Sequence, residues 1–173
     1  MKREIDLWEY APVILKQTEK GVLVTTKSGE EVNTMTIGWG TLGNQWHKPI
    51  YTVFVRQSRH TKKLLDENGE FTVNVPLDDS AKKILGVCGT ASGKDINKIE
   101  HLGLTLEEPE IISVPGIKEL PLTLECKVIY KQDQVLRAIN DENRLRYYEP
   151  GTKNEQDFHT AYYGQVVAAY IIE

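Results

Sequence analysis

Apolar and polar residues alternate along several short segments of the chain, with the period of two that is typical of β-strands. Residues 22–27 (VLVTTK) and 32–40 (VNTMTIGWG) flank the turn-forming segment SGEE, which predicts a β-hairpin. A turn at Gly43-Asn44 is predicted to lead into a third strand over residues 49–56, which is dense in β-branched and aromatic residues.

The same alternation recurs in the second half of the chain. It predicts strands over residues 71–76, 106–111, 122–134 and 161–172. Between the last two, residues 140–158 are polar and rich in Asp, Glu and Asn. This segment is predicted to be a long surface loop with a turn at its Pro-Gly pair.

Helical patterns are few and short. They are predicted over residues 62–67, 81–87 and 95–101, where capping residues or a following glycine mark the ends. Leu64 and Leu65 of the first helix are expected to face the core. Because helices do not alternate regularly with strands, a doubly wound parallel sheet is disfavoured. A mainly antiparallel barrel or sandwich with short peripheral helices fits the pattern better.

Composition narrows the possible functions. The chain has 173 residues, 40% hydrophobic and 27% charged, which predicts a single globular domain over residues 1–173. A formal net charge of −4 argues against a general nucleic-acid binder. No apolar run is long enough to span a bilayer and the first residues do not resemble a secretory signal. The chain has only two cysteines, far apart in the sequence, so a reduced, cytoplasmic setting without a disulfide framework is expected. Cys88 and Cys126 lack CxxC spacing and are interpreted as structural, and the four histidines show no metal-binding spacing.

A basic cluster interrupts this acidic chain where a predicted strand meets a helix, at residues 56–63 (RQSRHTKK). Such a junction exposes backbone N–H groups and the positive end of the helix dipole, which together attract anions. Arg56 and Arg59 can donate paired hydrogen bonds to a phosphate, and Ser58 and Thr61 add hydroxyl donors. The alternative is a solvated turn whose cations serve only solubility, and spacing alone favours that alternative.

A second segment changes the balance. Residues 33–40 (NTMTIGWG) combine strand character with small residues and hydroxyls, and glycine lets a flat ligand approach the backbone closely. Taken alone, the segment also fits a core strand with a bulge at Gly38.

Lys62 and Lys63 of the basic cluster, at the unfavourable end of the helix dipole, are interpreted as solvent-exposed residues.

The order and spacing of several motifs resemble those of the flavin reductase-like, flavoredoxin-type family. The motifs are NTMTIGWG, VRQSRHT, EFTVNVP, CGTASGKDINKIEHLGL and HTAYYGQV, and the resemblance runs from about Trp8 to Ile172. It implies an FMN-binding split β-barrel, antiparallel and Greek-key-like, that binds FMN non-covalently and usually forms a homodimer.

The resemblance also implies site residues. Those expected to contact the phosphate are Arg56, Ser58, Arg59 and Thr61. Those expected to line the ring, mainly through backbone, are Thr34, Met35 and Thr36, with Ser92 and Lys94 as a second set of phosphate or ring contacts. His159 is a catalytic candidate that faces the pocket, or else a strand-start residue hydrogen-bonded to a loop. The chain departs from the family at Gln57, His60 and Gln165, which bears on partner or nicotinamide specificity more than on FMN.

The implied activity is an FMN-dependent oxidoreductase that takes electrons from NADH or NADPH, or from a redox protein partner, and passes them to an acceptor. No GxGxxG fingerprint is present, so no dedicated Rossmann site for a nicotinamide is expected. Three alternatives stay open: an electron carrier without NAD(P)H activity, a non-catalytic flavin- or haem-storing protein, and a nucleic-acid-binding barrel, which the acidic net charge disfavours.

Overall fold

The computed structural model describes residues 1–173. The strands are β1 (Lys2–Glu4), β2 (Val22–Ser28), β3 (Glu31–Ile37), β4 (Gly40–Gln45), β5 (Lys48–Arg56), β6 (Glu70–Val75), β7 (Leu106–Glu107), β8 (Gly116–Ile117), β9 (Leu122–Asp133) and β10 (His159–Ile172). The helices are α1 (Leu7–Lys20), α2 (His60–Glu67), α3 (Lys82–Thr90), α4 (Lys98–Leu102), α5 (Asp141–Tyr147) and α6 (Lys153–Gln156), with short 3₁₀ turns at Asp79–Ala81 and Leu136–Ala138.

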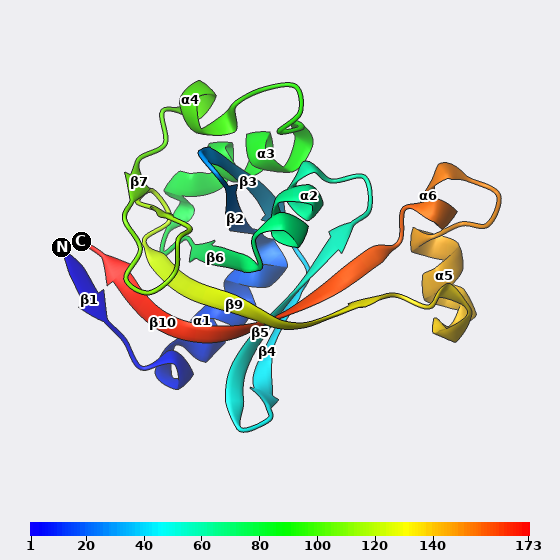
Figure 1. Cartoon of the computed structure of the whole chain (residues 1–173), viewed down its shortest axis with the longest axis horizontal. Coiled ribbons are helices and arrows are strands. Elements are labelled where there is room, and N and C mark those ends of the chain that lie inside the picture. Colours follow the sequence, from blue (N-terminus) through cyan, green and yellow to red (C-terminus); the bar gives the residue numbers. More distant parts are fainter.

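One antiparallel sheet forms the body of the molecule. Its strand order is β3-β2-β6-β9-β10-β5-β4, and β1 pairs with the end of β10. Strands β3 and β4 are consecutive in the chain but lie at opposite ends of this order, so the sheet curls around its core without closing there (Figure 1). The prediction of a mainly antiparallel β fold with short peripheral helices is confirmed.

The core lies inside the curved sheet. Alternate residues of six strands, with one residue from each of the helices α1 and α2, supply it, which is why the period-two pattern identified those strands. The members include Val22, Val24, Val53, Val55, Phe71, Val73, Leu122, Leu124 and Tyr162. Helix α1 adds the fully buried Ile14, and its Thr18 hydroxyl lies 2.7 Å from the Tyr51 hydroxyl inside the barrel.

Strand β10 organises the sheet because it is long enough to pair with three neighbours. Its first half lies between β5 and β9, and its last residues pair with β1. The β9–β10 register shifts between Tyr163 and Gly164, where a side chain could not fit. A Cβ on Gly164 would lie 2.4 Å from the ring of Phe71, so this position admits only glycine.

A second layer covers the outer face of β2 and β3. Leu23 faces outward into a smaller apolar cluster beneath α3, with Ala81, Cys88 and Leu104. The Thr36 hydroxyl of β3 donates a 2.6 Å hydrogen bond to the Leu85 carbonyl of α3. This layer fixes residues 88–98 beside β3, at the place where the candidate site forms.

Two expected boundaries in the first half of the chain were wrong. The segment 32–40 is not one strand, because β3 ends at Ile37 and a separate β4 begins at Gly40. The predicted turn at Gly43-Asn44 lies within β4, and the hairpin turns instead at Trp46-His47, whose φ values are 55° and 54°. A two-residue turn with positive φ matches the twist of a hairpin, but it rarely uses such residues, so sequence pattern favoured the Gly-Asn pair.

Three other expectations need correction. Helix α1 was not predicted; Asp6 caps it by accepting from the N–H groups of Trp8 and Glu9, and Pro12 lies inside it. The strand expected at 106–111 is only two residues long. The segment 140–158 was expected to be a loop, yet it contains α5 and α6, each capped by a polar side chain. Short polar helices carry little apolar periodicity, which explains the omission.

Candidate flavin site

A cavity of about 300 Å³ opens where β3, the β5–α2 loop and the segment after α3 meet. Its volume lies at the lower end of the range for small-molecule sites. Of the ten residues expected in the site, eight line this cavity: Met35, Thr36, Arg56, Ser58, Arg59, Thr61, Ser92 and His159. The sheet thus brings together segments that are far apart in the sequence.

Strand β3 supplies one wall of the cavity. Met35 is 8% exposed and Gly38 ends the wall without a side chain. Thr36 turns its hydroxyl toward α3 and so offers the cavity mainly carbon and backbone atoms. Thr34 does not line the cavity: its side chain is buried and donates to the Val24 carbonyl at 3.3 Å.

Arg56 ends β5 and is held by the chain itself. Its guanidinium donates to the Asp157 carbonyl at 2.8 Å and to the Tyr147 carbonyl at 3.3 Å. It also lies 5.3 Å from the centre of the Tyr148 ring, a cation–π distance. Arg56 therefore ties the α5–α6 region, residues 134–158, to the barrel as well as lining the cavity.

Ser58 is also engaged. Its backbone N–H donates to one carboxylate oxygen of Asp157 at 2.7 Å, and its hydroxyl donates to the other at 2.8 Å. An anion therefore already occupies the Ser58 donors, and that anion belongs to the chain. The junction does attract negative charge, as helix-terminus physics predicts.

The other two residues predicted to bind the phosphate, Arg59 and Thr61, make no contact with an acidic group of the chain. Arg59 is exposed at the start of α2, and its guanidinium makes no hydrogen bond or ion pair within the chain. Thr61 is 1% exposed and accepts a 2.9 Å hydrogen bond from the Asn33 side chain, which leaves its hydroxyl proton available. Arg59, Thr61 and the first turn of α2 form the part of the loop that is open to a ligand.

The SGKD turn closes the cavity from the side of α3. Ser92 lines it, while Lys94 lies outside it and reaches the Ser58 carbonyl only at 3.4 Å. Between them, Gly93 packs so closely that a Cβ would lie 2.1 Å from the Asn33 side-chain oxygen. The tight packing holds the turn against β3.

Lys98 also lines the cavity, and sequence reasoning missed it. It is 4% exposed, and its ammonium donates to the carbonyls of Thr34 at 3.0 Å and Cys88 at 3.1 Å, with no carboxylate partner. Burial lowers the pKa of this amine, the Cys88 thiol acts to raise it, and Arg59 lowers it further. A buried lysine without an acidic partner is unusual, because an unpaired charge is costly to bury. The arrangement favours an electron-rich ligand.

His159 begins β10 and lies both at the cavity and against a loop, while its catalytic role stays a prediction. It lines the cavity, and its Nδ1 shares a hydrogen bond with the Tyr148 hydroxyl of the α5–α6 region. Burial and the nearby Arg56 lower its pKa to about 4, so the imidazole is neutral near pH 7. The ring lies 5.1 Å from that of Trp39, which contacts Tyr147 edge-on at 4.9 Å. These aromatic residues form the outer rim of the cavity.

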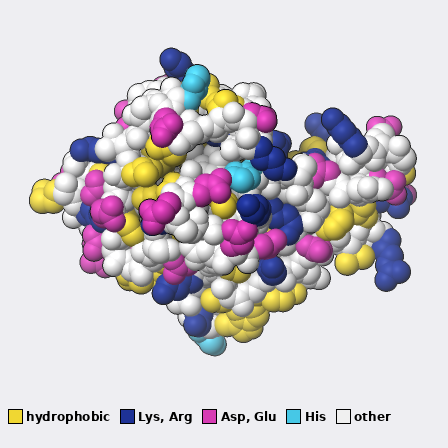
Figure 2. All heavy atoms as spheres, turned by 45° about the horizontal axis from the view of Figure 1, so that its top comes forward, with side chains coloured by type: hydrophobic (Ala, Val, Ile, Leu, Met, Phe, Trp, Pro, Cys, Tyr) yellow, Lys and Arg dark blue, Asp and Glu magenta, His cyan; other side chains and the backbone are white.

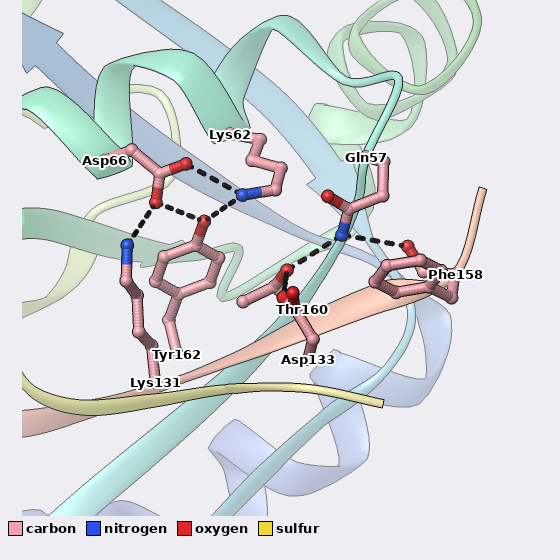
Figure 3. Close-up of polar contacts among 8 residues, drawn as sticks. All are labelled: Gln57, Lys62, Asp66, Lys131, Asp133, Phe158, Thr160 and Tyr162. Atoms are coloured by element: carbon pink, nitrogen blue, oxygen red, sulfur yellow. Dashed lines mark hydrogen bonds and ion pairs between the residues drawn. The ribbon is translucent and has the colours of Figure 1, made fainter. Parts of the chain in front are cut away.

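A polar network behind the β5–α2 loop holds it in position (Figure 3). The Gln57 side chain donates to the Thr160 hydroxyl at 2.8 Å, and Thr160 donates to Asp133. Gln57, one of the departures from the family pattern, thus fastens the loop to β10.

The neighbouring cluster is centred on Asp66, which accepts from Lys62 at 2.7 Å, Lys131 at 2.8 Å and the Tyr162 hydroxyl at 2.9 Å (Figure 3). Burial acts to raise the pKa of Asp66, but these hydrogen bonds outweigh it and lower the pKa to about 2. The interpretation of Lys62 as a solvent residue was therefore wrong, whereas the Lys63 side chain is 64% exposed.

Both cysteines are buried and free. Cys88 lines the cavity, and burial raises the pKa of its thiol, while Lys98 acts to lower it. Burial raises the pKa of Cys126 well above its usual range. Thiols with raised pKa values stay protonated near neutrality and are poor nucleophiles.

The surface around the cavity carries charges of both signs. Figure 2 shows basic side chains near the junction between the body and the projecting α5–α6 region, interspersed with acidic ones. One pair at the cavity edge joins His60 of α2 to Glu31 of β3. Basic side chains near the junction are therefore mixed with acidic ones and do not form a continuous positive surface. None of the helices is long and apolar enough to cross a bilayer.

Comparison with known proteins identifies the family. A family model described as "Flavin reductase like domain" matches residues 18–173, nearly the whole chain. The chain belongs to the flavin reductase-like family. This family member is 39% identical over 100 residues to a protein of Archaeoglobus fulgidus and 30% identical over 111 residues to one of Pyrococcus abyssi. The matches cover 58% and 64% of this chain, but only 55% and 62% of those relatives.

Solved structures of a flavoredoxin and of a flavin reductases-like enzyme are similar to this flavin reductase-like chain. The flavoredoxin from Methanosarcina acetivorans is 26% identical, with a TM-score of 0.68 over 88% of this chain and 68% of that one. An FMN-binding domain of a flavin reductases-like enzyme from Shewanella baltica is 19% identical, with a TM-score of 0.71 over 99% and 77% of the two chains. The predicted family and split-barrel fold are confirmed, and these relatives support the prediction of FMN.

Proposed function

We propose that residues 1–173 form a single FMN-binding domain of a flavoprotein oxidoreductase, with the flavin in the cavity described above. One observation carries the proposal: the same cavity is lined by Met35 and Thr36 of β3 and by Arg59, whose guanidinium has no hydrogen-bond or ion-pair partner within the chain. A flat heterocycle with an anionic tail needs a wall for its ring and a cation for its anion. The family and the FMN-binding relatives support the same ligand.

The residues divide the binding task. Arg59, Thr61 and the first turn of α2 would hold the phosphate, since their donors are free and the helix dipole favours an anion. The β3 wall would hold the ring, and Lys98 would place a positive charge beside it. The bound flavin would supply the hydride and electron transfer. The imidazole of His159 is neutral near pH 7, so it can donate or accept a hydrogen bond in the cavity but does not carry the second proton of an imidazolium ion.

The phosphate assignment is tested by comparing FMN with riboflavin, which lacks the phosphate. Arg59→Ala should weaken FMN about ten- to a hundredfold, the value of a charge-assisted hydrogen bond, and leave riboflavin within about twofold. Lys63→Ala is the matched control, because this substitution removes the same charge about one helical turn away and the Lys63 side chain is 64% exposed. Fluorescence titration measures both ligands. Equal losses for FMN and riboflavin in Arg59→Ala would contradict the assignment.

The electron donor is a separate part of the proposal. We propose that NADH or NADPH, or a redox protein, reduces the bound flavin, as in a flavin reductase or flavoredoxin. Anaerobic stopped-flow mixing with each nicotinamide distinguishes the cases. Rapid bleaching of the flavin absorbance supports a reductase, and bleaching only by a protein or chemical donor supports an electron carrier. A flavin that exchanges electrons with no donor would indicate a storage protein.

The quaternary state belongs to the same proposal. We propose a homodimer, as the resemblance to the family implies. Sedimentation equilibrium of the purified chain, with and without added FMN, measures the mass directly. A single species near the 19.7 kDa of one chain under both conditions would contradict the dimer.

A further inference from the structure

The Ser58 donors at the β5–α2 junction hold a carboxylate of the chain itself. Asp157 accepts from the Ser58 N–H at 2.7 Å with one oxygen and from the Ser58 hydroxyl at 2.8 Å with the other. A backbone N–H and a hydroxyl beside a helix start are the donors that a phosphate would use. Asp157 thus lies where one side of the ligand's phosphate is expected.

Asp157 is not a loosely placed surface residue. Its carbonyl accepts the 2.8 Å hydrogen bond from Arg56, and the next carbonyl, that of Phe158, accepts from the Gln57 N–H at 3.2 Å. These two hydrogen bonds fix the backbone at Asp157 and Phe158 to the barrel. The rest of the α5–α6 region projects away from the body, so Asp157 lies where this region attaches (Figure 1).

An anchored carboxylate should affect FMN and riboflavin differently. The phosphate of FMN carries a charge of about −1.5 to −2 near pH 7. It would compete with Asp157 for the Ser58 donors, and the two anions would repel each other at short range. Riboflavin has no phosphate and avoids both effects. Arg59 and Thr61, on the α2 side, stay available to either ligand.

We propose that Asp157 is a specificity-determining residue that weakens binding of the FMN phosphate and so narrows the preference for FMN over riboflavin. The inference rests on the proposed flavin-binding function and deepens it. Asp157 would act by occupying the Ser58 donors and by its charge, so that removing the charge while keeping the shape should strengthen FMN alone.

Asp157→Asn is the variant that does this, because an amide oxygen can still accept from the Ser58 N–H. FMN affinity should rise about tenfold, and riboflavin affinity should stay within about twofold. Asp141→Asn is the matched control: it removes one negative charge from the same region, but its only side-chain partner is Arg144. It should leave the FMN to riboflavin ratio unchanged.

Fluorescence titrations of both flavins, with thermal melting of each variant, give outcomes that separate the two ideas. If both flavins bind the wild type but Asp157→Asn strengthens neither, or both equally, the specificity role is wrong and the proposed function stands. If neither flavin binds any variant, both are wrong. Should Asp157→Asn unfold, Asp157→Ser decides in its place, with the same tenfold expectation for FMN.

Discussion

Protonation of His159 should limit the stability of this protein at mildly acidic pH. Burial and the neighbouring Arg56 lower its pKa to about 4, compared with about 6.5 in an unfolded chain. Below pH 6.5 the unfolded state therefore binds a proton that the folded state refuses, and stability falls until the pH reaches about 4. Between pH 7 and pH 5 this linkage removes about 2 kcal/mol from the free energy of unfolding.

The assay is urea denaturation at 25 °C of the wild type and His159→Gln, at pH 7, 6 and 5. Glutamine stays neutral and can still bond the Tyr148 hydroxyl, so it lacks the linkage. The stability difference between wild type and variant should shift by about 2 kcal/mol against the wild type on going from pH 7 to pH 5. Asp66 does not interfere, because its pKa of about 2 makes its contribution disappear only as the pH falls below about 4.

Two results would refute this reasoning. One is a stability difference between wild type and His159→Gln that stays constant across the three pH values. The other is a pKa above 6 for His159, measured from its ring proton shifts by NMR. Either would show that the imidazole is solvated in the folded state and that the cavity rim does not exclude water.

Further predictions concern the fold. Glu125→Gln should lower the free energy of unfolding by about 3 kcal/mol, because this fully buried carboxylate accepts from three consecutive backbone amides and a tyrosine hydroxyl; a change under 1 kcal/mol in urea would contradict it. Gly164→Ala should cost about 3 kcal/mol, since the new Cβ would meet Phe71, and Phe71→Leu should reduce that cost. Replacing Trp46-His47 by Asn-Gly should raise the free energy of unfolding by about 1 kcal/mol, because both residues have positive φ; an unchanged melting temperature would contradict this prediction.

The strands of the barrel were predictable because burial imposes a local pattern on them. Strands β2, β5 and β6 send alternate residues, such as Val53 and Val55 or Phe71 and Val73, into the main core, so this period of two identifies each strand without knowledge of its neighbours. Strand β4 could not be found in this way, because its residues are mostly small or polar and none is buried. The short helices α5 and α6 have no buried residue either, so they depend on capping and on contacts distant in sequence.

The candidate site divides along the same line. The charge and hydroxyl pattern at Arg59 and Thr61 is local, and the sequence predicted its place at a strand–helix junction. Lys98 was missed because a lysine at the start of a short helix normally faces solvent. Its burial results from the packing of α3 and α4 on β3, which places the Thr34 and Cys88 carbonyls around the amine. No pattern within the helix itself encodes those two acceptors.

The occupant of the Ser58 donors shows what register adds to sequence. In the antiparallel pairing of β5 with β10, Arg56 lies opposite His159. Continuing that register by two residues along each strand brings Ser58 opposite Asp157, although the two are 99 positions apart in the chain. The acid–hydroxyl contact therefore follows from strand pairing, not from the loop. In any chain with this pairing, an acidic residue two positions before the start of the last long strand should face the second residue of the β5–α2 loop, and its charge should then influence which flavin binds.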